Sequence, residues 1–387
     1  MTSYAADDPF ALAADLRSEE QLIATTVRDW VRRRFLPIVA DAWRAGALPA
    51  ELGAELGELG VLGMHLEGYG CAGASATAYG LTCLELEAGD SGLRSFVSVQ
   101  GSLAMYAIHA FGSDEQKQQW LPSMAAGEVI GCFGLTEPDA GSDPAAMRAS
   151  ARRDGDGWVL NGTKMWITNG SRAGVAVIWA KTDEGIRGFL VPAGSAGFRA
   201  VDIHDKLSLV ASTTSELVLE DCRVGADALL PGAGSLGAPL RCLNEARYGI
   251  VWGAVGAARA CLEAALEYTA TRTTFGAPIA TRQIVQQELV EMHVAVNNGL
   301  LLATRIGRLK DEGRVAPEHI SYGKFNNVRM ATDVARRARA LLGANGITLE
   351  YPVMRHLVNL ESVLTYEGTH QIHALVLGRA LTGASAF

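Results

Sequence analysis

The pentapeptide YEGTH, residues 366–370, lies in a turn-prone break between two apolar, helix-like segments near the C-terminus of this 387-residue chain. A carboxylate at Glu367, beside the ring of Tyr366, is expected to be partly desolvated, which raises its pKa and makes it a stronger proton acceptor. Gly368 lets the backbone approach a ligand closely, and Thr369 offers a hydroxyl donor. Read locally, Glu367 is either a general base or a solvated residue that caps the next helix.

The composition of the chain excludes several classes of protein. The formal net charge is −8 and no dense stripe of Lys or Arg occurs, which argues against a nucleic-acid partner. Six cysteines are scattered singly without a Cys-x-x-Cys pair, so we expect no metal site and a reducing compartment. Residues 1–16 do not resemble a signal peptide, and no apolar run of about 18 residues lacks charges or breakers. We therefore expect a soluble, cytoplasmic protein that does not span a membrane.

The hydrophobic period changes twice along the chain. Residues 18–127 have a helical pattern, residues 128–232 contain short β-branched runs between turn residues, and long Ala- and Leu-rich segments follow from residue 240. The Asp-Gly and Asn-Gly dipeptides within residues 154–157 and 161–162 predict β-hairpin turns. The pattern predicts an α+β protein in the order helices, small sheet, helices.

Two loops of the middle region join strand ends to polar and aromatic residues. Residues 131–144 (GCFGLTEPDAGSDP) run from an apolar strand into a loop where the amides of Leu135 and Thr136 can face the polar edge of a ring. Residues 164–170 (KMWITNG) place Trp166 beside a hydroxyl at the end of another strand. The alternatives are an ordinary surface loop and a core tryptophan.

A third motif has the spelling of a dinucleotide fingerprint without its context. Residues 232–237 (GAGSLG) match Gly-x-Gly-x-x-Gly, but the pattern predicts neither a strand before them nor a helix after them. We interpret this stretch as a linker.

A polar stripe occurs in an otherwise apolar segment. Glu87, Ser91, Arg94 and Ser98 are spaced by four, three and four residues, which places them on one face of a helix. If this face is buried, Arg94 must be paired, and Glu87 is the internal candidate. The alternative is a solvent-exposed face.

The region around Glu367, read as residues 361–380 (ESVLTYEGTHQIHALVLGRA), resembles the catalytic-base region of the acyl-CoA dehydrogenases, and among them most the glutaryl-CoA dehydrogenases. The two middle loops resemble the flavin-binding segments of the same family, and the order of motifs matches over residues 16–387. The resemblance implies an N-terminal helical domain (residues 1–127), a middle β-sheet or barrel domain (128–239) and a C-terminal four-helix bundle (240–387).

The resemblance also implies a cofactor, FAD, and the residues that bind it. Arg272, Phe275 and Gln283 match residues that serve the flavin of a neighbouring subunit, which implies a homotetramer; the Arg272 fork suits a phosphate. The complete set of matching flavin contacts is Phe133, Leu135, Thr136, Ser142, Trp166, Ile167, Thr168, Arg272, Phe275, Gln283, Thr369, Gln371 and Phe387.

Residues 89–100 (GDSGLRSFVSVQ) resemble the acyl-chain site of glutaryl-CoA dehydrogenases. The resemblance implies that Arg94 and Ser98 receive a distal carboxylate, with Glu87 and Tyr366 in support. Ser142 matches a position at the junction of flavin and thioester. The other matching substrate residues are Ser95, Asn244, Arg247 and Gly368.

Some family members carry the base on a different helix, at the position of Ala246, which cannot accept a proton. Glu245 is about 100° away around a helix and faces elsewhere. Glu367 is therefore the predicted base. The sequence departs from the family pattern at two positions: Ala344 stands where a second glycine that approaches the cofactor is usual, and Gln371 where the nearest relatives are usually acidic.

The function implied is FAD-dependent α,β-dehydrogenation of glutaryl-CoA with decarboxylation to crotonyl-CoA. Glu367 would take the α-proton while a hydride leaves the β-carbon, and an electron-transfer flavoprotein would reoxidise the flavin. Three alternatives remain open: a non-decarboxylating or differently specific dehydrogenase of acyl-CoA or acyl-carrier-protein thioesters, a flavin oxidase, and a helical scaffold without activity.

Overall fold

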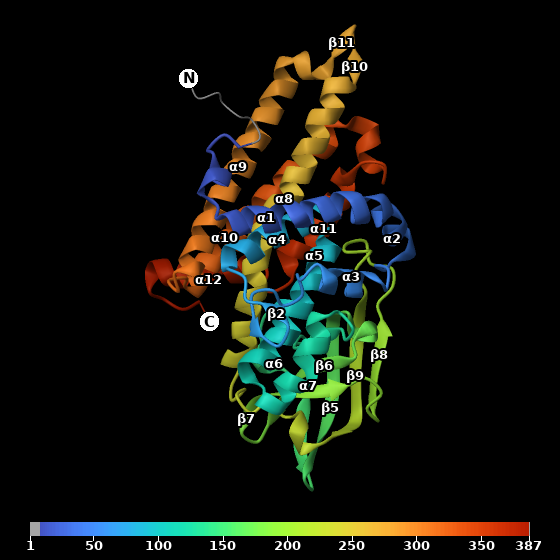
Figure 1. Cartoon of the computed structure of the whole chain (residues 1–387), viewed down its shortest axis with the longest axis vertical. Coiled ribbons are helices and arrows are strands. Elements are labelled where there is room, and N and C mark those ends of the chain that lie inside the picture. Colours follow the sequence, from blue (N-terminus) through green and yellow to red (C-terminus); the bar gives the residue numbers. More distant parts are fainter. Residues whose placement is uncertain (1–7, 387) are drawn as a thin grey trace. The chain divides into compact units, whose positions relative to one another are not determined.

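The computed structural model describes residues 8–386, and the chain divides into two compact units. Among the described residues, the first unit contains residues 8–41, 75–94 and 247–386, and the second contains Ala42–Ala74 and Ser95–Ala246. The first unit is mainly helical, whereas the second carries a large sheet (Figure 1). The predicted α+β class is confirmed, with helices before and after the sheet. The boundaries at residues 127/128 and 239/240 stay a prediction.

The first unit is built on helices, of which α2, α5 and α8 also supply residues of the second unit. Their bounds are η1 (Leu12–Asp15), α1 (Ser18–Trp30), the π-helical η2 (Val31–Phe35), η3 (Leu36–Ile38), α2 (Val39–Ala45), α4 (Ala76–Gly89), α5 (Ser91–Ser98), α8 (Gly237–Thr271), η8 (Ile279–Thr281), α9 (Gln283–Asp311), α10 (Pro317–Leu341), η9 (Gly343–Ile347), α11 (Pro352–Thr365) and α12 (His370–Thr382). A hairpin of β10 (Thr273–Thr274) and β11 (Ala277–Pro278) connects α8 to α9.

Helix α10 is central to this unit and packs against α9, α11 and α12. The buried amide of Asn327 on α10 donates to the carbonyl oxygens of Val251 (2.9 Å) and Gly299 (3.1 Å), so it joins three helices at one point. Glycine allows a second close approach, because a Cβ at Gly323 would lie 2.7 Å from the side chains of Ile306 and Val251. Helix α10 is thereby fixed beneath the segment that carries Glu367.

The second unit combines short helices with a seven-stranded sheet of order β3-β6-β4-β5-β9-β8, in which β7 pairs with β6. Its strands are β3 (Gly131–Gly134), β4 (Ser150–Asp154), β5 (Gly157–Thr168), β6 (Val175–Thr182), β7 (Gly185–Pro192), β8 (Phe198–Asp202) and β9 (Thr214–Val224). Its helices are α3 (Leu52–Glu58), the π-helical η4 (Val99–Met105), α6 (Tyr106–Phe111), α7 (Asp114–Ala125), η5 (Pro144–Ala146), η6 (Gly170–Arg172) and η7 (Ala226–Ala228), and a small ribbon pairs β1 (Glu67–Gly68) with β2 (Cys71–Ala72).

One of the two predicted hairpins is confirmed and the other is wrong. Gly155 and Asp156 form the two-residue turn between β4 and β5, whose ends pair at Asp154 and Gly157. Asn161 and Gly162 instead lie inside β5, at a register shift in its pairing with β9. The Asn161 side chain there accepts from the backbone N–H of Asp221 (2.8 Å), so a dipeptide typical of turns forms a bulge within a strand.

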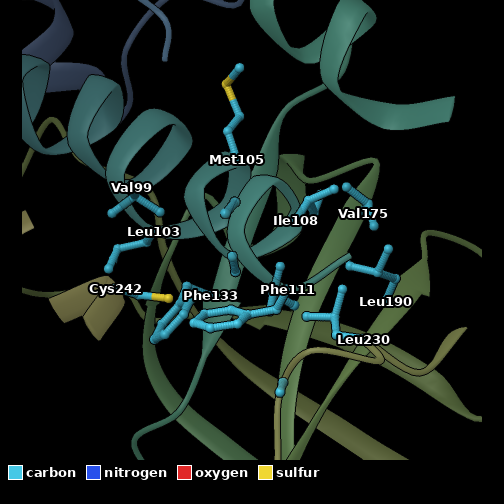
Figure 2. Packing of buried hydrophobic residues seen from close by; sticks show 14 of the residues in the cluster. Val99, Leu103, Met105, Ile108, Phe111, Phe133, Val175, Leu190, Leu230 and Cys242 are labelled. Atoms are coloured by element: carbon cyan, nitrogen blue, oxygen red, sulfur yellow. The ribbon is translucent and has the colours of Figure 1, made fainter. Parts of the chain in front are cut away.

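The core of the second unit packs helix side chains against one face of the sheet (Figure 2). Phe111 and Phe133 both contact Trp179, at ring-centroid distances of 6.4 and 5.8 Å. Burial of rings of this size, with edge-to-face contacts, is a major source of stability in a core. Ala246, which the resemblance matches to an alternate base position, is buried in the same cluster.

Residues 232–237 were predicted to open no helix, which is wrong because α8 begins at Gly237. No strand precedes them, since η7 (Ala226–Ala228) is the nearest element, so the dinucleotide context is still missing. Helix α8 is long and apolar enough to cross a membrane by length and composition alone, but 72% of its most apolar window is buried within the protein, as in a core helix.

Candidate active site

The segment that carries Glu367 is a short loop between α11, which ends at Thr365, and α12, which begins at His370. Thr369 is the residue that caps α12, and its hydroxyl accepts from the backbone N–H of Ile372 (3.3 Å). The alternative in which Glu367 caps this helix is therefore wrong. The Glu367 side chain is therefore not used as a helix cap.

Two consecutive residues of this loop, named here the base loop (residues 366–369), have left-handed backbone angles. Glu367 has φ 54° and Gly368 has φ 92°. A Cβ at Gly368 would lie 3.1 Å from His373 Nε2 and 3.2 Å from Arg247 Nη2, so the position requires glycine for space as well as for conformation. Glu367 itself is strained, because residues with a Cβ rarely adopt this region.

The carboxylate of Glu367 lies in an environment that opposes its ionisation. Oε2 is buried and has no hydrogen-bond partner among residues 8–386. Burial raises the pKa of Glu367 above its ordinary value, while the charges of Arg94, Lys324 and Arg247 act in the opposite direction. A carboxylate that has a raised pKa and an oxygen without a hydrogen bond is suited to accept a proton.

The base loop is held by cationic side chains from other helices. Arg247 Nε on α8 donates to the carbonyl oxygen of Glu367 (2.7 Å). Lys324 Nζ on α10 donates to the carbonyl oxygens of both Tyr366 and Gly368, the latter at 2.6 Å. No sequence motif marked Lys324 as a site residue, because its partners are backbone atoms. The one signal was that it is the last lysine of the chain, in a region where the other cations are arginines.

Arg94 is fully buried and paired as the polar stripe predicted. Its Nε donates to Glu87 Oε2 (2.7 Å), and its Nη2 donates to the hydroxyl of Tyr366 in the base loop. Burial opposes the charged form, but the nearby Glu87 carboxylate raises the pKa of Arg94 well above its ordinary value. Nη1 of this guanidinium is buried without a partner in the described part of the chain. The solvent-exposed alternative is wrong.

The stripe does not lie on one continuous helix, which corrects the prediction. The chain breaks at Asp90, whose extended backbone (φ −167°, ψ 142°) separates α4 from α5. Asp90 Oδ1 accepts from the N–H of Gly92 (2.6 Å), and Oδ2 accepts from Arg355 and from Asn359 (3.0 Å), both on α11. A buried ion pair thus fixes the junction, and Glu87 and Arg94 still meet across it.

Ser95 and Ser98 lie on the same helix as Arg94 and are buried. Ser98 Oγ has no hydrogen-bond partner among the residues described. Asn244 lies one turn before Arg247 on α8 and is partly buried. These residues remain candidates for contacts with an acyl thioester.

In the second unit the structure brings together the two loops predicted to bind flavin. Lys164 on β5 is buried, and its Nζ donates to the carbonyl oxygen of Leu135 (3.1 Å) and to Glu137 Oε1 (2.7 Å). Glu137 also accepts from the backbone N–H groups of Arg148 (2.6 Å) and Ala149 (2.9 Å). The N–H of Met165 donates to the carbonyl oxygen of Thr136 (2.8 Å), which joins the loops directly.

Trp166 lies at a second register shift in β5, with φ 63°, and 57% of its surface is exposed. The core-tryptophan alternative is therefore wrong, because the bulge turns this ring away from the core. Ile167 is buried in the sheet, and Thr168 ends the strand opposite Thr214. Phe133 packs its ring into the core of the second unit, as Figure 2 shows.

Most of the remaining predicted flavin residues lie at exposed positions, and Thr369 is half-buried. Phe275 is 98% exposed at the tip of the β10–β11 hairpin, with Arg272 and Gln283 exposed on either side of it. Ser142 is exposed in the loop before η5. Thr369 and Gln371 line a cavity of about 500 Å³, together with Arg329, Thr332, Asp333, Arg336, Leu364, Thr365 and His370. Phe387 lies outside the described residues.

Comparisons with known proteins show the family to which the chain is similar. Family models for the N-terminal, middle and C-terminal domains of acyl-CoA dehydrogenases match residues 17–128, 132–222 and 236–382. A glutaryl-CoA dehydrogenase from Mycobacterium smegmatis is similar over 100% of both chains, with 64% identity and a TM-score of 0.98. A second glutaryl-CoA dehydrogenase from that organism, solved in complex with FADH2, has 59% identity, full coverage of both chains and a TM-score of 0.98. The human mitochondrial short-chain specific acyl-CoA dehydrogenase is 36% identical over 94% of this chain and 90% of its own.

Proposed function

Because the chain belongs to the acyl-CoA dehydrogenase family, we propose that it dehydrogenates glutaryl-CoA and releases the distal carboxylate as carbon dioxide, giving crotonyl-CoA. Membership makes it an acyl-CoA dehydrogenase with FAD as cofactor. The substrate and the decarboxylation are the proposal. A solved relative described as a glutaryl-CoA dehydrogenase supports the choice of substrate.

The observation that carries the proposal is the buried Nη1 of Arg94. A guanidinium that is fully buried, fixed by Glu87 and Tyr366, still keeps one nitrogen without a hydrogen-bond partner in the described chain. Such a group is costly unless it is paired, and a carboxylate is the partner its geometry suits. A neutral acyl chain would leave this donor unsatisfied. A dicarboxylic acyl group gives it an anion.

The residues present fit the flavin cofactor. In the second unit, Trp166 is exposed at a bulge beside a loop that Lys164 and Glu137 hold in place. In the first unit, a cavity of about 500 Å³ is lined by Thr369 and Gln371 together with two arginines, a combination suited to a diphosphate. Bound FAD supplies the hydride acceptor for the β-carbon of the acyl chain.

Glu367 is the base that removes the α-proton. The side chain stands on a strained loop whose backbone is fixed by Arg247 and Lys324, so the carboxylate is aimed before substrate arrives. General-base catalysis of this kind contributes about 10²–10⁴ in rate. Removal of one proton and one hydride gives an unsaturated thioester that still bears its distal carboxylate.

Decarboxylation then replaces the distal carboxylate by a proton. The electron pair of the breaking C–C bond enters the conjugated thioester as carbon dioxide leaves, and a proton is taken up at carbon. Glu367, which already holds the proton taken from the substrate, is the donor we assign to this step. The overall reaction converts glutaryl-CoA to crotonyl-CoA and carbon dioxide, and bound FAD would take up the two electrons removed.

Further parts of the proposal concern assembly, electron acceptor and location. The exposed Phe275 hairpin, with Arg272 and Gln283 beside it, supports a homotetramer in which subunits share cofactor contacts. Light scattering on the flavin-loaded protein tests this, and a monomer with full flavin occupancy contradicts it. We also propose an electron-transfer flavoprotein as acceptor, and a cytoplasmic site of action.

Turnover of a series of acyl-CoA thioesters with a dye acceptor and with detection of carbon dioxide tests the function. Glutaryl-CoA is expected to be the best substrate and to yield one carbon dioxide per reduced dye. Turnover of glutaryl-CoA without carbon dioxide would mean a dehydrogenase that stops at the unsaturated diacid. A preference for butyryl-CoA would remove the dicarboxylate assignment, and rapid reoxidation by air would indicate an oxidase.

A further inference from the structure

The base loop has a conformation that its own sequence does not favour. Glu367, a residue with a Cβ, has φ 54°, and Gly368 follows with φ 92°. Such a residue persists in the left-handed region only when its surroundings hold it there. The question is which groups of the first unit do so.

Three consecutive carbonyl oxygens of the loop accept hydrogen bonds from cations. Arg247 Nε donates to that of Glu367 (2.7 Å). Lys324 Nζ donates to those of Tyr366 and Gly368, which flank Glu367 on both sides. One ammonium therefore spans the strained residue and fixes the orientation of the peptide planes before and after it.

Lys324 is otherwise an unusual lysine. It is only 2% exposed, and the hydrogen bonds of its Nζ go to two backbone carbonyl oxygens and not to a carboxylate. Its charge is compensated by the two carbonyl oxygens, by the Tyr366 ring with its centroid 5.7 Å away, and by the more distant Glu367 carboxylate. A buried cation without a paired anion is costly, so this position needs a reason beyond packing.

We propose that Lys324 is a positioning residue for catalysis: it fixes the left-handed turn that aims the Glu367 carboxylate and places a positive charge near that carboxylate. This inference rests on the proposed role of Glu367 as the base. Lys324 touches the backbone of the base loop and not the reacting carboxylate, so it acts through Glu367.

The electrostatic part of the inference has a definite sign. Burial raises the pKa of Glu367, and Lys324 is one of the cations that lower it again. Burial lowers the pKa of Lys324 to about 7, and ionised Glu367 acts against that shift, so each group favours the charged form of the other. The titratable and charged groups around this pair are Glu87, Arg94 and Cys83 from the α4–α5 segment, Arg247 from α8, and Tyr366, His370 and His373 from the base loop and α12.

Glu367 must be ionised to accept the α-proton, so kcat rises as pH rises through its pKa. Removing the charge of Lys324 raises that pKa further and moves the acid limb of the profile to higher pH. In the wild type, loss of the Lys324 charge as pH rises through its pKa of about 7 adds a falling limb. That limb is absent from a variant without the ammonium.

Two substitutions separate the clamp from the charge. Lys324→Met removes both, while Lys324→Gln removes the charge and keeps an amide that can donate to two carbonyl oxygens. We expect flavin-loaded Lys324→Met to lose about 10²-fold in kcat, since misplacement by about 1 Å has an effect of that size. Lys324→Gln recovers part of kcat but shows the same shift of the acid limb. The matched control is Lys310→Met, a partly exposed lysine of α9, which leaves both unchanged.

Hydrogen exchange of the peptide that covers residues 364–372 gives a readout independent of turnover. Lys324→Met is expected to exchange faster there than the wild type, and Lys324→Gln less so. The inference is overturned if flavin-loaded Lys324→Met has the kcat of the wild type. It is also overturned if kcat is lowered while the acid limb of the pH profile stays in place, because Lys324 then has a structural role alone. If Lys324→Met does not fold, the acid limb of Lys324→Gln decides in the same way. If the wild type oxidises no acyl-CoA, the proposed function fails, while the exchange data still test the clamp.

Discussion

Each unit of the molecule buries a carboxylate with a cation, and the two pairs differ in what they leave unsatisfied. In the second unit, Glu137 accepts from Lys164 and from two backbone N–H groups, and every polar atom of the pair has a partner. In the first unit, the pair of Glu87 and Arg94 leaves Oε1 of the glutamate and Nη1 of the arginine without partners in the described chain. A satisfied pair holds a loop, whereas an unsatisfied pair keeps capacity for a ligand.

The pKa values of two carboxyl groups, Glu137 in the second unit and Glu367 in the first, are shifted in opposite directions. Burial raises and the N–H groups of Arg148 and Ala149 lower the pKa of Glu137, with a net lowering in which Lys164 also takes part. Glu367, next to the unsatisfied pair, has a raised pKa and an oxygen without a hydrogen bond. The pKa of the Glu137 carboxyl is thus lowered where it holds a loop, and that of Glu367 is raised, as suits the proton acceptor we propose it to be.

The largest expected effect on the reaction rate is at Glu367, which lies next to the unsatisfied pair. Glu367→Gln removes the proton acceptor and keeps size and polarity, so acyl-CoA oxidation is expected to fall by about three orders of magnitude with flavin content unchanged, because a general base contributes about 10²–10⁴. Steady-state turnover and the flavin spectrum of the purified variant measure both. Retention of a tenth of the activity would place the base elsewhere, with Glu245 the next residue to test.

Breaking the satisfied pair is expected to affect stability instead. Lys164→Met leaves Glu137 buried without its cation, a change that typically destabilises by about 3–5 kcal/mol. Denaturant unfolding of the holoenzyme measures it, with Lys181→Met, at an exposed lysine of β6, as the control. The double variant with Glu137→Gln is expected to be less destabilised than Lys164→Met alone. If kcat per bound flavin falls as far as in Glu367→Gln, the division between structural and catalytic pairs is wrong.

Arg94→Gln tests whether the unsatisfied donor serves a distal carboxylate. Loss of one partner of a desolvated charge pair costs about 2–5 kcal/mol, or roughly thirty- to several-thousand-fold in kcat/KM. Glutaryl-CoA turnover is expected to suffer by this factor and butyryl-CoA turnover far less, since butyryl-CoA has no distal charge. The ratio of kcat/KM for the two substrates is the measurement. Equal losses on both would make Arg94 a structural partner of Glu87.

The smallest effect is expected at Ser98. Ser98→Ala deletes one neutral hydroxyl whose oxygen is buried without a partner in the described residues, so it should cost about 1 kcal/mol with glutaryl-CoA. The direction is the same as for Arg94→Gln. Ser102→Ala, at another buried serine, is the control. Loss of stability without a change in the substrate ratio would assign Ser98 to packing.

Local spacing predicted the pair of Glu87 and Arg94 but not the helix break at Asp90 that lies between them. The interval from Glu87 to Arg94 was enough to predict an ion pair, since it equals two helical turns. The end of α4 at Asp90 was not predictable, because Arg355 and Asn359, the partners that hold it, are more than 260 residues away along the chain. Lys324 was missed for a related reason, as its hydrogen bonds go to backbone oxygens that carry no residue identity.

The resemblance to the acyl-CoA dehydrogenases was clearest in short, continuous loops. The motif of residues 366–370, which includes the base loop, was recognisable from its five residues alone. The prediction that Trp166 contacts a ligand is consistent with the exposed position that its bulge gives it. The hairpin predicted at Asn161 and Gly162 was wrong because a dipeptide that forms turns also suits a β-bulge. Pairing of β5 with β9 makes it a bulge here. Contacts between distant strands are not encoded in any short window.

The buried Asp90 has a consequence for how this protein tolerates sequence change. Its carboxylate ties the start of α5, which bears Arg94, to Arg355 and Asn359 on α11, the helix that leads into the base loop. In a library of all single substitutions scored by growth, positions 90, 355 and 359 should therefore be as intolerant as the reacting residues. A map that ranks positions by distance from the substrate would overlook them. When variants of related sequences are interpreted, substitutions at Asp90, Arg355 and Asn359 should be assessed together, because Arg355 and Asn359 share Asp90 as their hydrogen-bond partner.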